Sequence, residues 1–322
     1  MKISGSIYSD NKRPLKETIA DLEAHQVDLL HIDCNDDIRV FDDIVDIRTW
    51  CKLPIDLHII TKTPEKYFDL LRKHPVEYVT FQYEKLPIDF RMPSDIKGQK
   101  GLAIITPTDI SAFDKFSDFD FILIMATIPG QSGGVFDPIN FKKIRNFKQK
   151  YPNKNVHVDG GVNGEVSFIL RNMGVHTSVS GSFLFKAASV GQALMDLTKR
   201  EIVSLFKIKD FMIPREECPI IDMSELTLKN ILEQITFGKL GVTLVEKNKK
   251  FEGIISNADL RRTLLQEMIN KTPVTILDTA TVDNMLNLVR EQSFPVMYLP
   301  VLNAEGNAVG IITFVNLIKG EI

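Results

Sequence analysis

Short apolar runs alternate with amphipathic stretches from residue 1 to residue 203, and this alternation limits the fold more than any other feature of the sequence. The runs have the length and composition of strands, and apolar residues recur at helical spacing between them. Such alternation is typical of parallel β-α units. Eight runs favour a closed TIM (β/α)8 barrel over an open doubly wound sheet. The expected strands are Ile3–Ile7, Asp28–Ile32, Ile55–Ile59, Tyr78–Phe81, Gly101–Ile105, Phe121–Met125, Asn155–Val158 and Thr177–Val179, and the expected helices include Leu15–Ala24, Glu65–Arg72, Phe141–Lys148 and Glu165–Met173.

A different pattern begins near Lys207, where one segment of the chain is repeated. The segment Phe251-Glu-Gly-Ile-Ile-Ser-Asn-Ala-Asp259-Leu returns as Ala308-Val-Gly-Ile-Ile-Thr-Phe-Val-Asn316-Leu. Self-similarity of this kind predicts two copies of one unit, here of β-β-α type.

The sequence therefore predicts an α/β barrel domain over residues 1–203 and an α+β pair over residues 207–322. The two copies in the pair are expected to cover about 207–265 and 268–322. The boundary falls within 197–209, a polar stretch for which we expect a helix and a stiff junction.

Composition excludes several classes of function. A net charge of −3 gives no basic surface for nucleic acid, and no polybasic segment favours a membrane surface. No apolar run approaches membrane-spanning length, and the first residues contain no signal-peptide core. The three cysteines form no C-x-x-C pair and fit free thiols in a reducing compartment. We expect a cytoplasmic protein that binds neither nucleic acid nor membrane.

Two histidines and two aspartates stand at the ends of three expected strands. His31 and Asp33 are two residues apart and so share one side of their strand; His58 and Asp159 end two others. Imidazole and carboxylate groups suit a divalent metal such as Zn²⁺, Fe²⁺, Mn²⁺ or Co²⁺. The two carboxylates could also exchange protons with a substrate. Taken singly, each residue has a simpler explanation, a core histidine or a helix cap.

Glycine-rich turns follow the last three expected strands. They are Pro129-Gly130-Gln131-Ser132-Gly133-Gly134, Asp159-Gly160-Gly161 and Ser180-Gly181-Ser182. Glycine lets backbone N–H groups approach a ligand closely, and in such barrels a phosphate is commonly held at this place. Three such turns favour phosphate binding, with Gly130, Gly133 and Gly160 as candidates, over ordinary tight turns.

The order of the motifs resembles that of ribulose-phosphate 3-epimerases, over nearly all of residues 1–200. The matching segments are Gly5-Ser6-Ile7-Tyr8-Ser9, Leu30-His31-Ile32-Asp33, Ile55-Asp56-Leu57-His58, Val79-Thr80-Phe81-Gln82-Tyr83-Glu84, Gly101-Leu102-Ala103, Pro129-Gly130, Val158-Asp159-Gly160-Gly161 and Val179-Ser180-Gly181-Ser182. Related decarboxylases and synthases carry D-x-K-x-x-D on the third strand; the lysine is absent here.

The resemblance implies a role for each matching residue. His31, Asp33, His58 and Asp159 would hold one divalent metal, and the two aspartates would also act as the acid and the base. Ser6 would contact the substrate, and Gly161, Gly181 and Ser182 would hold its phosphate. The implied reaction is the 3-epimerisation of a ketose phosphate, D-ribulose 5-phosphate to D-xylulose 5-phosphate or a close analogue, through an enediolate.

The chain departs from the family pattern where the substrate would be enclosed. The two methionines expected near the reacting carbons fall on Asn35 and Ile60, and the histidine of the fourth strand falls on Gln82. Two alternatives therefore stay open. One is an epimerase of a different sugar phosphate, serving surface polysaccharide synthesis. The other is a catalytically silent protein that senses sugar phosphates and nucleotides.

Residues 207–322 resemble a tandem pair of CBS domains. In such pairs a turn with Ser or Thr and Asp binds the ribose of an adenine nucleotide, which points to Ser256, Asp259 and Thr313. The second copy has Asn316 at the aspartate position. The resemblance implies nucleotide regulation, the alternative being a packing and dimerisation module. For either we expect a homo-oligomer.

Overall fold

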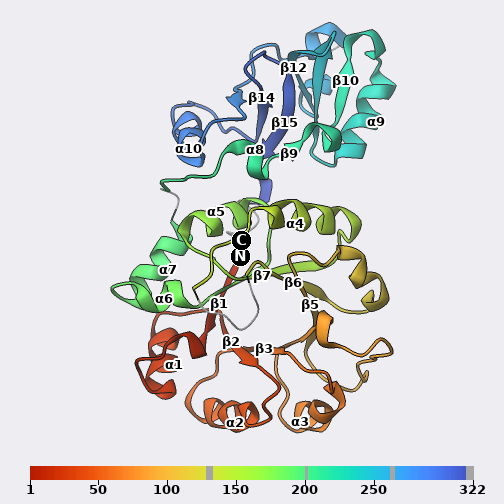
Figure 1. The fold of residues 1–322 in the computed structure, drawn as a ribbon. Helices are drawn as coiled ribbons and strands as arrows, with labels where there is room; N and C mark the ends of the chain where they lie inside the picture. The colour runs from red at the N-terminus through yellow and green to blue at the C-terminus, as the bar shows by residue number, and fades with distance from the viewer. Residues whose placement is uncertain (128–132, 200–201, 262–264, 317–322) are drawn as a thin grey trace. The chain divides into compact units, whose positions relative to one another are not determined.

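The computed structural model describes residues 1–127, 133–199, 202–261 and 265–316, which form two compact units, Met1–Arg200 and Glu201–Ile322. In the first unit, eight parallel strands pair in chain order and close into a barrel, with helices around the outside (Figure 1). The predicted TIM barrel is therefore confirmed. Its strands are β1 (Lys2–Ser6), β2 (Leu29–Cys34), β3 (Ile55–Ile59), β4 (Tyr78–Gln82), β5 (Gln99–Ile105), β6 (Phe121–Met125), β7 (Asn155–Asp159) and β8 (Thr177–Ser180).

Helices cover the barrel by burying one apolar face each. Ile19 and Leu22 of α1 and Phe141 and Ile144 of α4 are almost fully buried, as helical spacing of apolar residues requires. The barrel helices are α1 (Leu15–Ala24), α2 (Val40–Trp50), α3 (Phe68–Lys73), α4 (Ile139–Lys150), α5 (Gly164–Asn172), α6 (Ser182–Lys186) and α7 (Val190–Thr198). Short 3-10 turns lie in the connections: η1 (Ile7–Ser9) and η2 (Pro64–Tyr67) precede α1 and α3, and η3 (Tyr83–Lys85) and η4 (Ile110–Phe116) lie between strands.

Some expectations about the helices need correction. Helix α2 was not predicted, because its three aspartates hide the spacing of Phe41, Ile44 and Ile47, all buried. The helix expected over residues 65–72 is divided into η2 and α3. The helix expected at the domain junction is wrong for residues 202–206, which have no helical structure.

Strand register gathers polar side chains at the carboxyl end of the barrel. Asp33 lies opposite His58, and Asp159 lies opposite Met125. Deeper in the barrel the side chains are mainly apolar, and His157 packs there with its ring stacked on Phe121 at 4.0 Å between centroids. Burial lowers the pKa of His157 to about 3, so this histidine is a neutral core residue.

The second unit contains two small sheets of like topology. Strands β10 (Ile220–Asp222), β11 (Val242–Lys247) and β12 (Lys250–Ser256) form one sheet; β13 (Ile276–Leu277), β14 (Tyr298–Leu302), β15 (Ala308–Thr313) and β9 (Ile213–Pro214) form the other. In both, a helix precedes an antiparallel hairpin: α9 (Leu228–Gly238) and α10 (Val282–Arg290). The repeat thus has a β-α-β-β form, which adds a helix before the predicted hairpin.

The two halves of this unit share a core and are linked by the half-buried Arg215. Leu244 and Ile254 of the first sheet pack in one cluster with Ala308 and Ile311 of the second. Arg215 donates to both carboxylate oxygens of Glu246 and to the carbonyl oxygen of Ala308, and so ties the halves together. In the described part of the chain, no helix is both long and apolar enough to cross a membrane.

The repeated glycines mark places where two backbones touch. A methyl group on Gly253 would overlap the carbonyl oxygen of Asn270, which accepts a hydrogen bond from the N–H of Ile254. We expect Gly253→Ala to lower the free energy of unfolding by about 3 kcal/mol, since a close-packed backbone cannot yield. Gly306, which has φ +79° but open space around it, is the matched control, and Gly306→Ala is expected to cost about 1 kcal/mol.

Urea unfolding of the full chain measures both values. Equal losses in the two variants would contradict the packing argument.

Candidate metal centre

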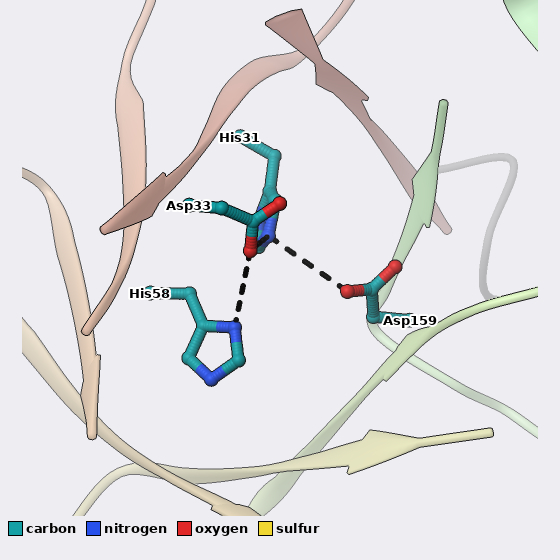
Figure 2. Close-up of side chains that lie close together, drawn as sticks. All are labelled: His31, Asp33, His58 and Asp159. Carbon is teal, nitrogen blue, oxygen red and sulfur yellow. Dashed lines mark ion pairs between the residues drawn. The ribbon is translucent and has the colours of Figure 1, made fainter. Parts of the chain in front are cut away.

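Four side chains from three strands converge at the carboxyl end of the barrel (Figure 2). His31 and Asp33 come from β2, His58 from β3 and Asp159 from β7; one ligand atom of each lies within 4.8 Å of all the others. His31 Nε2 and His58 Nδ1 are each 3.4 Å from Asp33 Oδ1, and His31 Nε2 is 3.9 Å from Asp159 Oδ2. The structure thus brings together the four residues that the sequence analysis chose as metal ligands.

Three of these ligand atoms are buried without a hydrogen-bond partner. They are His31 Nε2, Asp33 Oδ1 and His58 Nδ1. The distance of 3.4 Å from each nitrogen to Asp33 Oδ1 exceeds that of a good hydrogen bond, and an unsatisfied buried polar atom costs about 1–3 kcal/mol. A cation between them would satisfy all three at once. The residues present therefore fit a divalent metal with nitrogen and oxygen ligands.

The outer nitrogens of both histidines have buried partners. His31 Nδ1 lies 2.9 Å from Asp56 Oδ2, which also accepts from Ser4 Oγ at 3.0 Å. His58 Nε2 lies 2.9 Å from Gln82 Oε1. Each acceptor favours a ring proton on the nitrogen that it faces, His31 Nδ1 or His58 Nε2. The other nitrogen of each ring can then give its lone pair to a metal bound among His31, Asp33, His58 and Asp159, which we call the ligand group.

Sequence reasoning gave no role to Asp56 or Gln82. A signal for Asp56 was present: it is two residues before His58 and so faces the barrel interior beside His31. The sequence marks Gln82 only as standing where the family has a histidine; its contact with His58 could not be predicted, because it depends on the rotation of an amide group.

The two carboxylates of the ligand group differ in pKa. Burial disfavours the charge of Asp33, but in the metal-free protein the positive charge of the His31 ring and the contacts with His31 and His58 outweigh burial and hold the pKa of Asp33 well below the usual range. The carboxylates of Asp56 and Asp33 in turn raise the pKa of His31 despite its burial. Burial dominates at Asp159 and raises its pKa to about 6, although the same imidazoles oppose the shift. In the metal-free protein one carboxylate is thus ionised while the other is poised between forms near neutral pH.

The predicted phosphate residues lie near one another where the structure describes them. A methyl group on Gly133 would sit 3.8 Å from Ser182 Oγ, and one on Gly181 would sit 3.3 Å from Ser6 Cβ. Gly160 and Gly161 have φ of +108° and +67°, which only glycine adopts readily. Gly130 lies outside the described residues.

One cation near these turns was missed by the sequence analysis. Lys186 Nζ would be 3.5 Å from a methyl group on Gly133. No motif marks this lysine, since it is the last residue of α6 and one of many in the chain.

In the second unit, the first repeat forms a compact turn after β12. Ser256 donates to Asp259 Oδ2 from its backbone nitrogen at 2.9 Å and from its hydroxyl at 2.6 Å. Thr313 ends β15 at the corresponding place in the second repeat.

The fold and the site define a class: a TIM barrel with a histidine and aspartate ligand group at the carboxyl ends of its strands. Residues 2–185 match the model of the ribulose-phosphate 3 epimerase family, and the chain belongs to this family. It is therefore a member of an isomerase family. Residues 265–321 match the CBS domain model.

Similar proteins cover the barrel and the C-terminal unit separately. The ribulose-phosphate 3-epimerase of Methanocaldococcus jannaschii is 29% identical over 227 residues, which span 66% of this chain and 95% of that protein. The Bacillus subtilis ribulose-phosphate 3-epimerase is 27% identical over 61% of this chain and 98% of its own length. A solved structure titled CBSX2 in complex with AMP covers 36% of this chain and 96% of that chain, with 21% identity and a TM-score of 0.31.

The raised pKa of Asp159 predicts how acidity affects the metal-free protein. Because the folded pKa is about 6 against an ordinary value of 3.8, the folded state holds a proton that the unfolded chain releases in this interval. This contribution to stability is complete below the ordinary pKa and is lost as pH rises through 6. Asparagine cannot ionise and so lacks this pH dependence. We therefore expect the free energy of unfolding of Asp159→Asn, minus that of wild type, to be larger at about pH 7.5 than at about pH 4.5.

Urea unfolding of both proteins in EDTA at the two pH values measures this difference, in which the titration of groups distant from residue 159 cancels. A stability difference between them that does not change with pH would refute the shift.

Proposed function

We propose that the barrel catalyses the metal-dependent 3-epimerisation of a ketose phosphate, with D-ribulose 5-phosphate as the first substrate to test. The observation that carries the proposal is the group of His31, Asp33, His58 and Asp159, with three buried ligand atoms unsatisfied. The family of the barrel supports the same activity.

Inversion at C3 requires a proton to leave one face of the carbon and another to arrive on the opposite face. Asp33 from β2 and Asp159 from β7 approach the centre from different sides (Figure 2), as two such groups must. One carboxylate would take the proton, leaving an enediolate of the sugar, and the other carboxylic acid would return one. The bound divalent ion supplies Lewis-acid stabilisation of the negative charge that develops on the sugar oxygens.

The two histidines would also fix the orientation of the carboxylates that act as acid and base. Asp33 Oδ1 lies at equal distances from His31 and His58, so it is held between two buried rings. Gly133, Gly160, Gly161, Gly181 and Ser182 would bind the phosphate through backbone N–H groups, and Ser6 would contact the sugar. Binding the phosphate at a distance from the reacting carbon places C3 between the two carboxylates.

Replacement of either carboxylate tests the proposed reaction. We expect Asp33→Asn and Asp159→Asn each to reduce kcat by about 10²–10⁴-fold, because an amide cannot move the proton. Exchange of solvent deuterium into C3 of D-ribulose 5-phosphate, followed by NMR with measured metal content, reports turnover directly. Asp95→Asn, a change of the same kind at a residue paired with Arg72 on the exposed surface, should leave exchange unchanged.

A wild-type protein that binds metal but exchanges no proton into any ketose phosphate would defeat the epimerase proposal. It would instead support the catalytically silent sensor, an alternative motivated by Asn35 and Ile60, which replace the expected methionines near the reacting carbons.

We propose in addition that the C-terminal unit binds an adenine nucleotide and regulates the barrel. The turn of Ser256 and Asp259 offers a carboxylate and a hydroxyl to the two ribose hydroxyls. In the second repeat, Thr313 offers the hydroxyl while Asn316 replaces the carboxylate, so the two repeats should differ in affinity.

Removal of the turn carboxylate tests the nucleotide site. We expect Asp259→Ala to weaken AMP or ATP binding by at least about tenfold in calorimetry, and to abolish the effect of nucleotide on turnover. Asp222→Ala is a matched control, because Asp222 accepts from the nitrogen and hydroxyl of Ser224 in a similar turn. If wild type binds no nucleotide, the unit serves packing or dimerisation instead.

A further inference from the structure

The outward nitrogen of His58 begins a chain of hydrogen bonds that leaves the metal centre. Gln82, only 2% exposed, accepts at Oε1 from His58 Nε2. Its amide nitrogen donates to Glu84 Oε2 and lies 3.5 Å from the carbonyl oxygen of Ala103. Because two acceptors face the nitrogen end of the amide, its oxygen end must face His58.

Glu84 is held in turn by donors alone. Its second oxygen, Oε1, accepts from the N–H of Ile105 at 3.0 Å and from the hydroxyl of Thr108. Lys143 of α4 fixes this turn, since its amino group donates to the carbonyl oxygens of Ile105, Thr106 and Thr108. Both carboxylate oxygens of Glu84 therefore have to be acceptors.

We propose that Gln82 and Glu84 are positioning residues that fix the tautomer of His58, so that its Nδ1 lone pair faces the ligand group. This inference rests on the proposed metal site. The carboxylate of Asp56 fixes the tautomer of His31 directly, since it lies 2.9 Å from Nδ1. On His58 the carboxylate acts through a neutral amide, whose orientation it sets. In this chain, then, the direction of one metal ligand is decided by a residue two hydrogen bonds away.

A one-atom change at Glu84 should reverse the direction of the hydrogen bonds that link residue 84, Gln82 and His58. In Glu84→Gln, the single oxygen is needed by Ile105 and Thr108, so the new NH₂ faces Gln82. We expect the amide of Gln82 to turn and to present N–H to His58, because its contact with the carbonyl oxygen of Ala103, at 3.5 Å, is weaker than a hydrogen bond from the new NH₂. The ring proton moves to Nδ1 and points into the ligand group, where it opposes a cation.

Exchanging the two residues should restore the original direction. In the double variant Gln82→Glu with Glu84→Gln, the carboxylate at 82 accepts from both His58 and the new amide nitrogen. The amide oxygen at 84 still accepts from Ile105 and Thr108. Every donor then has an acceptor again, and His58 Nε2 carries the proton.

Two measurements on the whole chain test this hydrogen-bond relay from Glu84 through Gln82 to His58. ¹⁵N NMR of the metal-free protein reads the His58 tautomer, and titration with Co²⁺, followed by its visible absorption, reads affinity. We expect Glu84→Gln to shift His58 toward the Nδ1–H form and weaken Co²⁺ binding by about tenfold, and Gln82→Met to weaken it by about 10–100-fold. The exchanged pair should recover the wild-type tautomer and most of the affinity.

Asp69→Asn, which removes one charge from the exposed surface, is the control and should change neither readout. Wild type that binds no Co²⁺ would defeat the metal site itself. Wild type that binds Co²⁺, together with a Glu84→Gln variant of unchanged tautomer and affinity, would overturn the relay alone. Loss in the single variants without recovery in the exchanged pair would also overturn it, because it would indicate general disruption.

Discussion

The register between β2 and β3 is the constraint on which the site depends. It sets Asp33 beside His58 and His31 beside Asp56, so that three of the four side chains of the candidate metal centre meet and Asp56 lies against the far side of His31. A slip of β3 by one residue would turn both Asp56 and His58 out of the barrel. The ligand group and the orientation of one of its histidines thus come from the same pairing, and β7 needs to add only Asp159.

The barrel could be predicted from the sequence because its physical signals are local. Apolar runs and helical spacing set the eight strands and helices such as α1, whose observed bounds equal the expected ones. The four residues of the candidate metal centre could be chosen as well, since His31 and Asp33 share a strand face and the carboxyl ends of parallel strands meet at one rim. Helix α2 was not predicted, because its aspartates obscure the helical spacing of its buried apolar residues.

Contacts between side chains far apart in the chain could not be predicted in the same way. The link from His58 to Gln82 depends on the rotamer and flip of an amide, and that from Glu84 to Thr108 on the turn after β5. These are choices made by tertiary packing, and no spacing in the sequence records them. Likewise, Lys186 reaches the glycine turns only because α6 follows β8 at once.

The edge strand β9 has a consequence for how the C-terminal unit is put together. Ile213 and Pro214 precede the first repeat in the chain, yet they pair with β15 of the second. Arg215 extends this link by bonding Glu246 of one sheet and Ala308 of the other. The repeats are therefore interleaved rather than strung in series. If the chain were cut between the halves, the second sheet would lose β9 and Arg215 would lose the carbonyl oxygen of Ala308, so we expect the two halves to fold together as one unit.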